Sequence, residues 1–114
     1  SNFVQLYLFR YLFKELYMNI TISGDNLNLG NHLNFYTQKK ISDIFAKYSC
    51  NPVFCKITFA KNQNRFDCYI SSYLDASVGF QSKYSDRNIY ASLKICMSRF
   101  EKQIRRFKRK IKVH

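Results

Sequence analysis

The hydrophobic and polar positions of the chain follow two different periods, and each change of period marks a new predicted element. Several short runs alternate apolar and polar residues, which is typical of β-strands with one buried face. Two longer segments repeat apolar residues at helical spacing, which predicts amphipathic helices. The expected strands cover about residues 19–23, 53–60, 66–73 and 77–84, and the expected helices cover about 31–48 and 88–107.

The second predicted helix has the most regular pattern in the chain. No Gly or Pro interrupts it, and Ser85, Asp86 and Asn88 are each suited to cap its start. We expect a regular helix to about residue 107 and fraying of the charged end beyond it. Its apolar positions are Ile89, Leu93, Cys96, Met97, Phe100, Ile104, Phe107 and Ile111.

The first predicted helix and the strands supply the rest of the core. Asn31 is the expected N-cap of this helix, and the Asn51-Pro52 dipeptide follows its end. The helix directs Leu33, Thr37, Ile41, Ile44, Phe45 and Tyr48 inward. The strands direct Val53, Cys55, Ile57, Phe59, Phe66, Cys68, Ile70, Val78 and Phe80 inward, and Lys56, Thr58, Tyr69 and Ser71 outward.

The predicted element order is β-α-β-β-β-α, and short turns between the last three strands predict an antiparallel meander. Only one face of the sheet is apolar throughout, so both helices must cover that face. The predicted fold class is therefore α+β. It is a four-stranded sheet with two helices packed on one face, a two-layer sandwich like that of double-stranded-RNA-binding domains.

Residues 1–18 differ from the rest of the chain and are predicted to form an apolar, helical N-terminal extension to a domain at 19–114. Residues 3–17 are mostly apolar or aromatic, yet they are too few and too charged to span a bilayer. The apolar surface needs a cover, which is the domain's own sheet, a second copy of the chain in a homo-oligomer, or a membrane surface. The membrane is the least favoured of the three.

Composition restricts the classes of partner. The chain has 114 residues, enough for one domain, with 19 Lys and Arg against 7 Asp and Glu and a net charge of +12. Hydrophobic residues make up 46%, which excludes a disordered basic tail. A folded domain this basic has a polyanion as its expected partner, with nucleic acid ahead of an anionic membrane.

The sequence offers no chemistry that would support catalysis or a cofactor. The four cysteines form no C-x-x-C pair, and only His32 and His114 are available to complete a metal site, so no metal is expected. The cysteines are instead expected to be reduced thiols in a reducing compartment. The acids form no recognisable pair, and no HExxH, GxSxG or P-loop motif is present, so we expect no enzyme.

More than half of the net charge lies at the end of the chain. Residues 99–112 contain eight bases and one acid, Glu101. A solvated helix face usually mixes charges of both signs, whereas like charges at this density repel one another unless a polyanion neutralises them. Arg also donates paired hydrogen bonds to phosphate, which favours a functional RNA-binding face over a merely solvated one. The bases are Arg99, Lys102, Arg105, Arg106, Lys108, Arg109, Lys110 and Lys112.

Three stretches resemble a known family. They are MNITISGDNLNL from Met18, NIYASLK at 88–94 and RFEKQIRRFKRKIKVH at 99–114. They are similar to the first strand, the D-x-Y-x-A-h-D signature and the basic helix end of bacterial ribosome hibernation-promoting factors. This family is also known as protein Y, ribosome-associated inhibitor or sigma-54 modulation protein. The chain from Met18 onward resembles its N-terminal ribosome-binding domain.

The resemblance implies a non-enzymatic inhibitor of translation. Such proteins bind small-subunit rRNA in the mRNA channel, across the sites where tRNA anticodons pair, and hold ribosomes inactive under stress or in stationary phase. A cytoplasmic, ribosome-associated protein without a cofactor is implied. The residues implied to bind RNA are Lys39, Lys40, Lys47, Arg87, Tyr90, Arg99, Lys102, Arg105, Arg106, Arg109 and Lys110.

The chain departs from the family pattern at three positions. Asn88 and Lys94 replace the two acids of the signature, and Asp43 stands where relatives often carry a base. Two other interpretations remain. A generic RNA-binding module of the double-stranded-RNA-binding class would begin with a helix, whereas here a strand comes first. A peripheral membrane protein would use residues 3–17 together with the basic residues.

Overall fold

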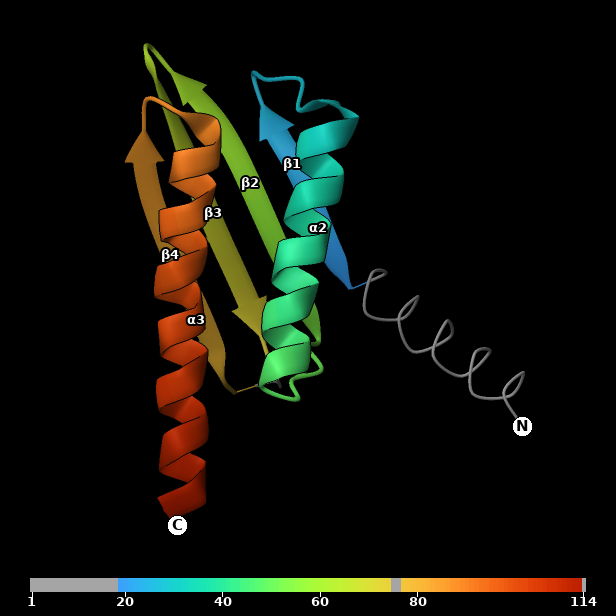
Figure 1. Cartoon of the computed structure of the whole chain (residues 1–114), viewed down its shortest axis with the longest axis vertical. Helices are drawn as coiled ribbons and strands as arrows, with labels where there is room; N and C mark the ends of the chain where they lie inside the picture. The colour runs from blue at the N-terminus through green and yellow to red at the C-terminus, as the bar shows by residue number, and fades with distance from the viewer. Residues whose placement is uncertain (1–18, 75–76, 114) are drawn as a thin grey trace, which may run out of the picture.

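The computed structural model describes residues 19–74 and 77–113, and its elements follow the predicted order (Figure 1). The strands are β1 (Ile20–Asp25), β2 (Phe54–Asn62), β3 (Arg65–Tyr73) and β4 (Gly79–Asp86), and the helices are α2 (Gly30–Lys47) and α3 (Ile89–Val113). The predicted N-terminal extension at residues 1–18, with its candidate homo-oligomer contact, lies outside the described residues.

The four strands form one mixed sheet in the order β1-β2-β3-β4. β1 pairs with β2 in parallel, while β2 with β3 and β3 with β4 pair antiparallel, which confirms the predicted meander. A parallel pair cannot be joined by a tight turn, so the chain crosses between β1 and β2 through α2. The predicted fold class is confirmed, including the placement of both helices on one face.

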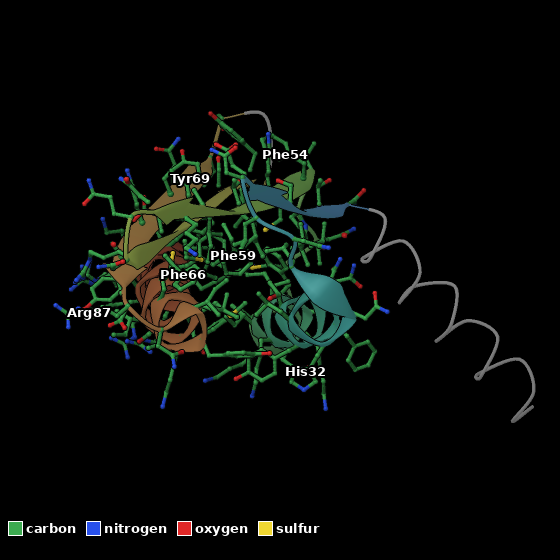
Figure 2. The ribbon with its side chains drawn as sticks, turned by 90° about the horizontal axis from the view of Figure 1, so that it is seen from above. His32, Phe54, Phe59, Phe66, Tyr69 and Arg87 are labelled. Atoms are coloured by element: carbon green, nitrogen blue, oxygen red, sulfur yellow. The ribbon has the colours of Figure 1, made fainter. Side chains whose placement is uncertain are left out.

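The two helices cover the same face of the sheet and run in the same direction (Figure 1). α2 lies beside β1, and α3 lies along β3 and β4. Viewed along the helices, the sheet and the helices form two layers, with Phe59 between them and Tyr69 on the opposite face (Figure 2). One face of the sheet is therefore buried and the other is left open by the described elements.

Apolar side chains from every element fill the space between the layers. Phe45 of α2 and Phe100 of α3 meet edge to face with ring centroids 6.0 Å apart, and Phe100 also contacts Phe80 of β4 at 6.4 Å. Aromatic pairs of this geometry add to the energy of simple burial. The buried apolar residues are Ile20, Leu33, Ile41, Phe45, Cys55, Ile57, Phe59, Cys68, Ile70, Leu93, Cys96, Met97, Phe100 and Ile104.

Hydroxyl groups fix the position of α3 on β4. Ser82 donates from Oγ to the carbonyl oxygen of Cys96 at 2.8 Å, and Ser92 donates from Oγ to the carbonyl oxygen of Tyr84 at 2.9 Å. Both serines are buried, so each bond forms away from competing water. The helix is thereby held at two heights along the strand.

Asn88 caps α3, as expected. Its Oδ1 accepts hydrogen bonds from the backbone N–H groups of Tyr90 and Ala91 at 2.9 and 3.1 Å. Asp86 in turn accepts from the N–H of Asn88 at 2.9 Å. The helix continues to Val113, so the fraying expected after residue 107 does not occur within the described residues.

Three predictions about single residues are wrong. Asn31 is not the N-cap of α2, because the helix begins at Gly30 and Leu29 occupies the cap position without a side-chain hydrogen bond. Val53 is 60% exposed, since β2 begins one residue later and Val53 donates its N–H to the carbonyl of Tyr73 from outside the strand. Ile111 is 53% exposed, because α3 runs past the end of the sheet that would cover it (Figure 1).

A glutamine side chain protects the edge strand β4. Gln103 of α3 donates from Nε2 to the carbonyl oxygen of Gln81 at 2.6 Å, and its Oε1 accepts from the N–H of Gln81 at 3.3 Å. An unpaired strand edge is a template for association with another strand. The amide of Gln103 occupies that template at the middle of β4.

The four cysteines are free thiols, and Cys55, Cys68 and Cys96 are buried, as predicted. Burial raises the pKa of Cys55 to about 12 and also raises the pKa of the half-buried Cys50. Since the thiolate is the reactive form, the fold suppresses thiol chemistry at these positions.

Truncation of Phe100 tests the contact between the layers. Phe100→Ala should lower the free energy of unfolding by about 3–5 kcal/mol, because it removes a fully buried ring and leaves a cavity. Phe35→Ala is the matched control, since Phe35 is 70% exposed on α2 and should change stability by less than about 0.5 kcal/mol. Urea denaturation measures both, and equal losses would contradict the assigned core.

Thiol labelling tests the burial of the cysteines. In the native protein at about pH 8, a disulfide reagent should modify Cys50 first and leave Cys55, Cys68 and Cys96 protected until the chain unfolds. The folded state also keeps the Cys55 proton to a pH of about 12, whereas the unfolded chain loses it near 9.0, so stability should fall as the pH rises above that value. Simultaneous labelling of all four thiols in the native protein would refute this arrangement.

Candidate RNA-binding face

Most bases of the two helices lie on the sides turned away from the sheet, because the apolar stripe of each helix is used for packing. On α2, Lys39, Lys40 and Lys47 are exposed. On α3, Lys94 is exposed together with most of the predicted residues, while Arg105 is half-buried. The exposed predicted bases of α3 are Arg99, Lys102, Arg106, Arg109 and Lys110. Most of the predicted bases of both helices are thus exposed to solvent on the helix layer of the molecule.

The bases of α3 divide between two sides of the helix. Lys94 lines the groove between α3 and α2 and also a second hollow along α3, which Arg99 and Lys102 line as well. Arg99 faces β4, where its guanidinium lies over the ring of Tyr84 at 4.9 Å from the centroid. This cation–π contact holds the guanidinium against the protein surface, where it has no carboxylate partner among the described residues.

Most of these cations have no acidic partner. Among the described residues, the single ion pair joins Lys47 Nζ of α2 to Glu101 Oε1 of α3 at 3.1 Å. The hydrogen bond to Glu101 raises the pKa of Lys47, and its Coulombic attraction adds to the effect. Tyr48 also donates its hydroxyl to Glu101, at 3.5 Å. The arginines predicted to bind RNA therefore have no carboxylate partner in the described part of the chain.

The groove between the helices has a mixed lining. Lys40 and Lys47 come from α2 and Lys94 from α3, with the acids Asp43 and Glu101 on opposite sides. The floor is apolar and includes Ile44 and Met97. Asp43 thus lines the groove and reduces its positive potential.

An aromatic cluster joins the first turns of the two helices, and sequence analysis missed it. The hydroxyl of Tyr90 lies 2.7 Å from Nδ1 of His32, and its ring meets Tyr36 edge to face at 5.5 Å. Lys40 lies over the ring of Tyr36 at 5.5 Å. Tyr90 remains 37% exposed, so it packs against α2 and faces solvent at the same time. The pairing joins residues 58 positions apart, which no local pattern in the sequence indicates.

Arg87, which was predicted to bind RNA, and Lys108, which was not, lie away from this cluster. Arg87 is exposed in the connection before α3, at the side of the molecule in Figure 2. Lys108 is half-buried and lies near the Cys50 thiol. Burial raises the pKa of Cys50, and the positive charge of Lys108 partly offsets that rise. Lys108 was counted in the basic segment but not among the predicted site residues.

The described residues contain no group of three or more metal-ligating side chains. No described helix is long and apolar enough to cross a membrane.

Comparison with known proteins identifies the fold. The family described as sigma 54 modulation protein / S30EA ribosomal protein matches residues 20–112, which include β1, every later strand and nearly all of α3. The chain belongs to this family. Membership confirms the resemblance found in the sequence and agrees with the expectation of a ribosome hibernation factor rather than an enzyme.

Individual relatives of this S30EA family are distant in sequence. The ribosome hibernation promotion factor of Rhizobium meliloti (strain 1021) is 26% identical over 97 residues, covering 85% of this chain and 51% of the relative. The chain thus spans about half the length of that curated relative.

Two solved structures share the fold of the S30EA chain. The ribosomal subunit interface protein of Coxiella burnetii is 18% identical with a TM-score of 0.69, covering 78% of this chain and 96% of its own. The N-terminal domain of Thermus thermophilus Protein Y is 20% identical with a TM-score of 0.66, and the match covers 76% of this chain and 94% of that domain's chain.

Neutralising Glu101 tests whether it limits the positive potential of the helix face. Glu101→Gln should release Lys47 and steepen the salt dependence of binding to a short RNA duplex by about one unit of log K against log[NaCl]. Asp25→Asn makes the same charge change on β1 and should have a smaller effect. Fluorescence anisotropy over a salt series measures both variants, and identical slopes would argue against this role of Glu101.

Proposed function

We propose that this chain is a ribosome hibernation factor that binds small-subunit rRNA in the mRNA channel, across the region of the tRNA anticodons, and blocks translation under stress or in stationary phase. The observation that carries the proposal is the face of α3, where exposed arginines and lysines lack carboxylate partners in the described residues. The S30EA family assignment supplies the ribosome as the context for that face.

The bases of α3 form the main contact in this proposal. A continuous helix presents them along about 1.5 Å of rise per residue, so the span from Arg99 to Lys110 measures about 17 Å. The guanidinium groups donate in pairs to phosphate oxygens, which suits a surface of folded RNA. The proposed contacts on this helix are Arg99, Lys102, Arg105, Arg106, Arg109 and Lys110.

α2 and the starts of the helices contribute a second set of proposed contacts. Lys39 and Lys40 are exposed and have no acidic partner among the described residues, whereas Lys47 must exchange Glu101 for phosphate on binding. Arg87 and Tyr90 flank the start of α3, and Tyr90 is held against His32 of α2. The aromatic ring of Tyr90 offers a surface for a base or sugar beside the phosphate contacts.

Two alternatives have less support. A double-stranded-RNA-binding module would begin with a helix, whereas the described fold begins with β1 before α2. A peripheral membrane protein would depend on residues 3–17, which lie outside the described residues. The proposal places the ribosome-binding unit at residues 19–114 and the protein in the cytoplasm with the ribosome.

Charge reversal on α3 tests the proposal directly. Arg106→Glu with Arg109→Glu should abolish co-sedimentation with small ribosomal subunits at physiological salt, because each reversal replaces a phosphate contact with repulsion. The same variant should no longer inhibit translation in a reconstituted extract. Pelleting over a salt series gives the affinity and its salt dependence.

The control carries the same change of charge at a distant place. Lys61→Glu with Arg65→Glu alters two exposed bases beside the β2–β3 turn and should leave pelleting nearly unchanged. If the two variants lose binding equally, net charge rather than the α3 face determines affinity. Inhibition of translation by the α3 variant at the level of wild type would refute the proposal.

A further inference from the structure

The face of the sheet opposite the helices is left uncovered by the described elements and has its own chemical pattern. We call it the open face, formed by the outward side chains of β1 to β4. Figure 2 shows Phe54 and Tyr69 on this side and Phe59 on the other. From the row of Phe54 to the row of Tyr69, the residues of the open face are Thr21, Ser23, Phe54, Lys56, Thr58, Tyr69, Ser71, Tyr73, Gln81 and Lys83.

Aromatic side chains lie on the two central strands of the open face. Phe54 of β2 pairs with Tyr73 of β3, and their ring centroids are 5.2 Å apart. The two side chains are 41% and 37% exposed. The Tyr73 ring also covers Gly79 of β4, where any larger residue would clash with it. These contacts fix the direction of the rings while leaving part of each open to solvent.

Tyr69 stands in the next aromatic position along β3. It is half-buried between Thr58 of β2 and Lys83 of β4 in the same cross-strand row. Tyr73 lies four positions further along β3, which places the two Cα atoms about 13 Å apart along the strand. A chain lying along β3 would therefore meet two separate aromatic positions.

Lysines lie between and beside these rings. Lys56 sits between Phe54 and Thr58 on β2, and Lys83 lies across from Tyr69. Both are exposed, and neither has an acidic partner among the described residues. The carboxylates of Asp25 and Asp67 lie in the row at the far end of the face, beyond Tyr69. In the rows from Phe54 to Tyr69, the charged residues are thus Lys56 and Lys83, and both are positive.

From this arrangement we infer that the open face binds single-stranded RNA, with bases stacked on Phe54, Tyr69 and Tyr73 and phosphates near Lys56 and Lys83. Every base has a π-face, so stacking on aromatic residues binds single strands with little sequence preference. Two lysines without partners favour an anionic occupant over an apolar one. Duplex RNA does not offer unstacked bases and should bind the open face poorly.

This inference is independent of the ribosome proposal, which uses the opposite side of the molecule. In that proposal the α3 face meets folded RNA mainly through phosphate contacts, whereas the open face needs unpaired bases. A protein with both faces would hold two RNA segments on opposite sides of a sheet and helix layer.

A titration of the intact wild-type chain locates the binding face without any mutation. Addition of a short single-stranded RNA to isotope-labelled protein should shift the backbone amide signals of Thr58, Tyr69 and Ser71 in the NMR spectrum. A short RNA duplex should shift signals of α3 instead. Shifts confined to α2 and α3 with the single strand would overturn the inference and leave the ribosome proposal standing.

A pair of double variants tests stacking itself. Phe54→Leu with Tyr69→Leu keeps apolar bulk but removes the π-faces, and should weaken single-strand binding about tenfold or more in fluorescence anisotropy. Phe54→Tyr with Tyr69→Phe keeps both rings and should bind like wild type. Circular dichroism checks that each variant folds.

The remaining outcomes also decide the question. Equal affinity of the leucine and aromatic variants would overturn the inference. If the leucine variant instead loses self-association in sedimentation equilibrium while RNA binding is unchanged, the face is an interface between copies of the chain, and the inference is wrong. Loss of ribosome pelleting on α3 reversal, with single-strand shifts on β2 and β3 retained, would show the two faces to be separate.

Discussion

The rotation of α3 about its own axis is the constraint on which the rest of the structure depends. Phe100, packed edge to face against Phe45 and Phe80, fixes which side of the helix points inward. The hydroxyls of Ser82 and Ser92 hold the same rotation, because each donates a hydrogen bond to a backbone carbonyl of the opposite element. A helix so fixed exposes most of its cations on the sides that do not pack against the sheet. The positive potential of this face is therefore a product of core packing as well as of composition.

Much of the fold was predictable because the buried face of each element repeats at its own period. The stripe of α3 and the alternation in β2 and β3 identified Leu93, Phe100, Ile57 and Ile70 correctly as core. Errors arose at the ends of elements, where periodicity stops carrying information. Ile111 continues the helical stripe in sequence, but the sheet beneath it has already ended.

The candidate site was predictable only in part. The bases of α3 form a local run, so their exposure on one side followed from helical spacing. The pairing of Lys47 with Glu101 and of His32 with Tyr90 depends on how closely α2 approaches α3, which is set by the whole core and not by any short segment. The clamp of Gln103 on Gln81 likewise joins two polar residues that carry no pattern of their own. The RNA contacts themselves remain predictions.

Because α3 extends past the sheet, its first part packs in the core and its last turns are exposed to solvent. Buried residues end at Ile104, Phe107 is half-buried against Phe80, and beyond it Ile111 is exposed. Side chains in these last turns contribute little to the core, so exchanging them changes the cohesion of the domain only slightly. Affinity for a polyanion and thermal stability can thus be changed separately by substitutions in these last turns.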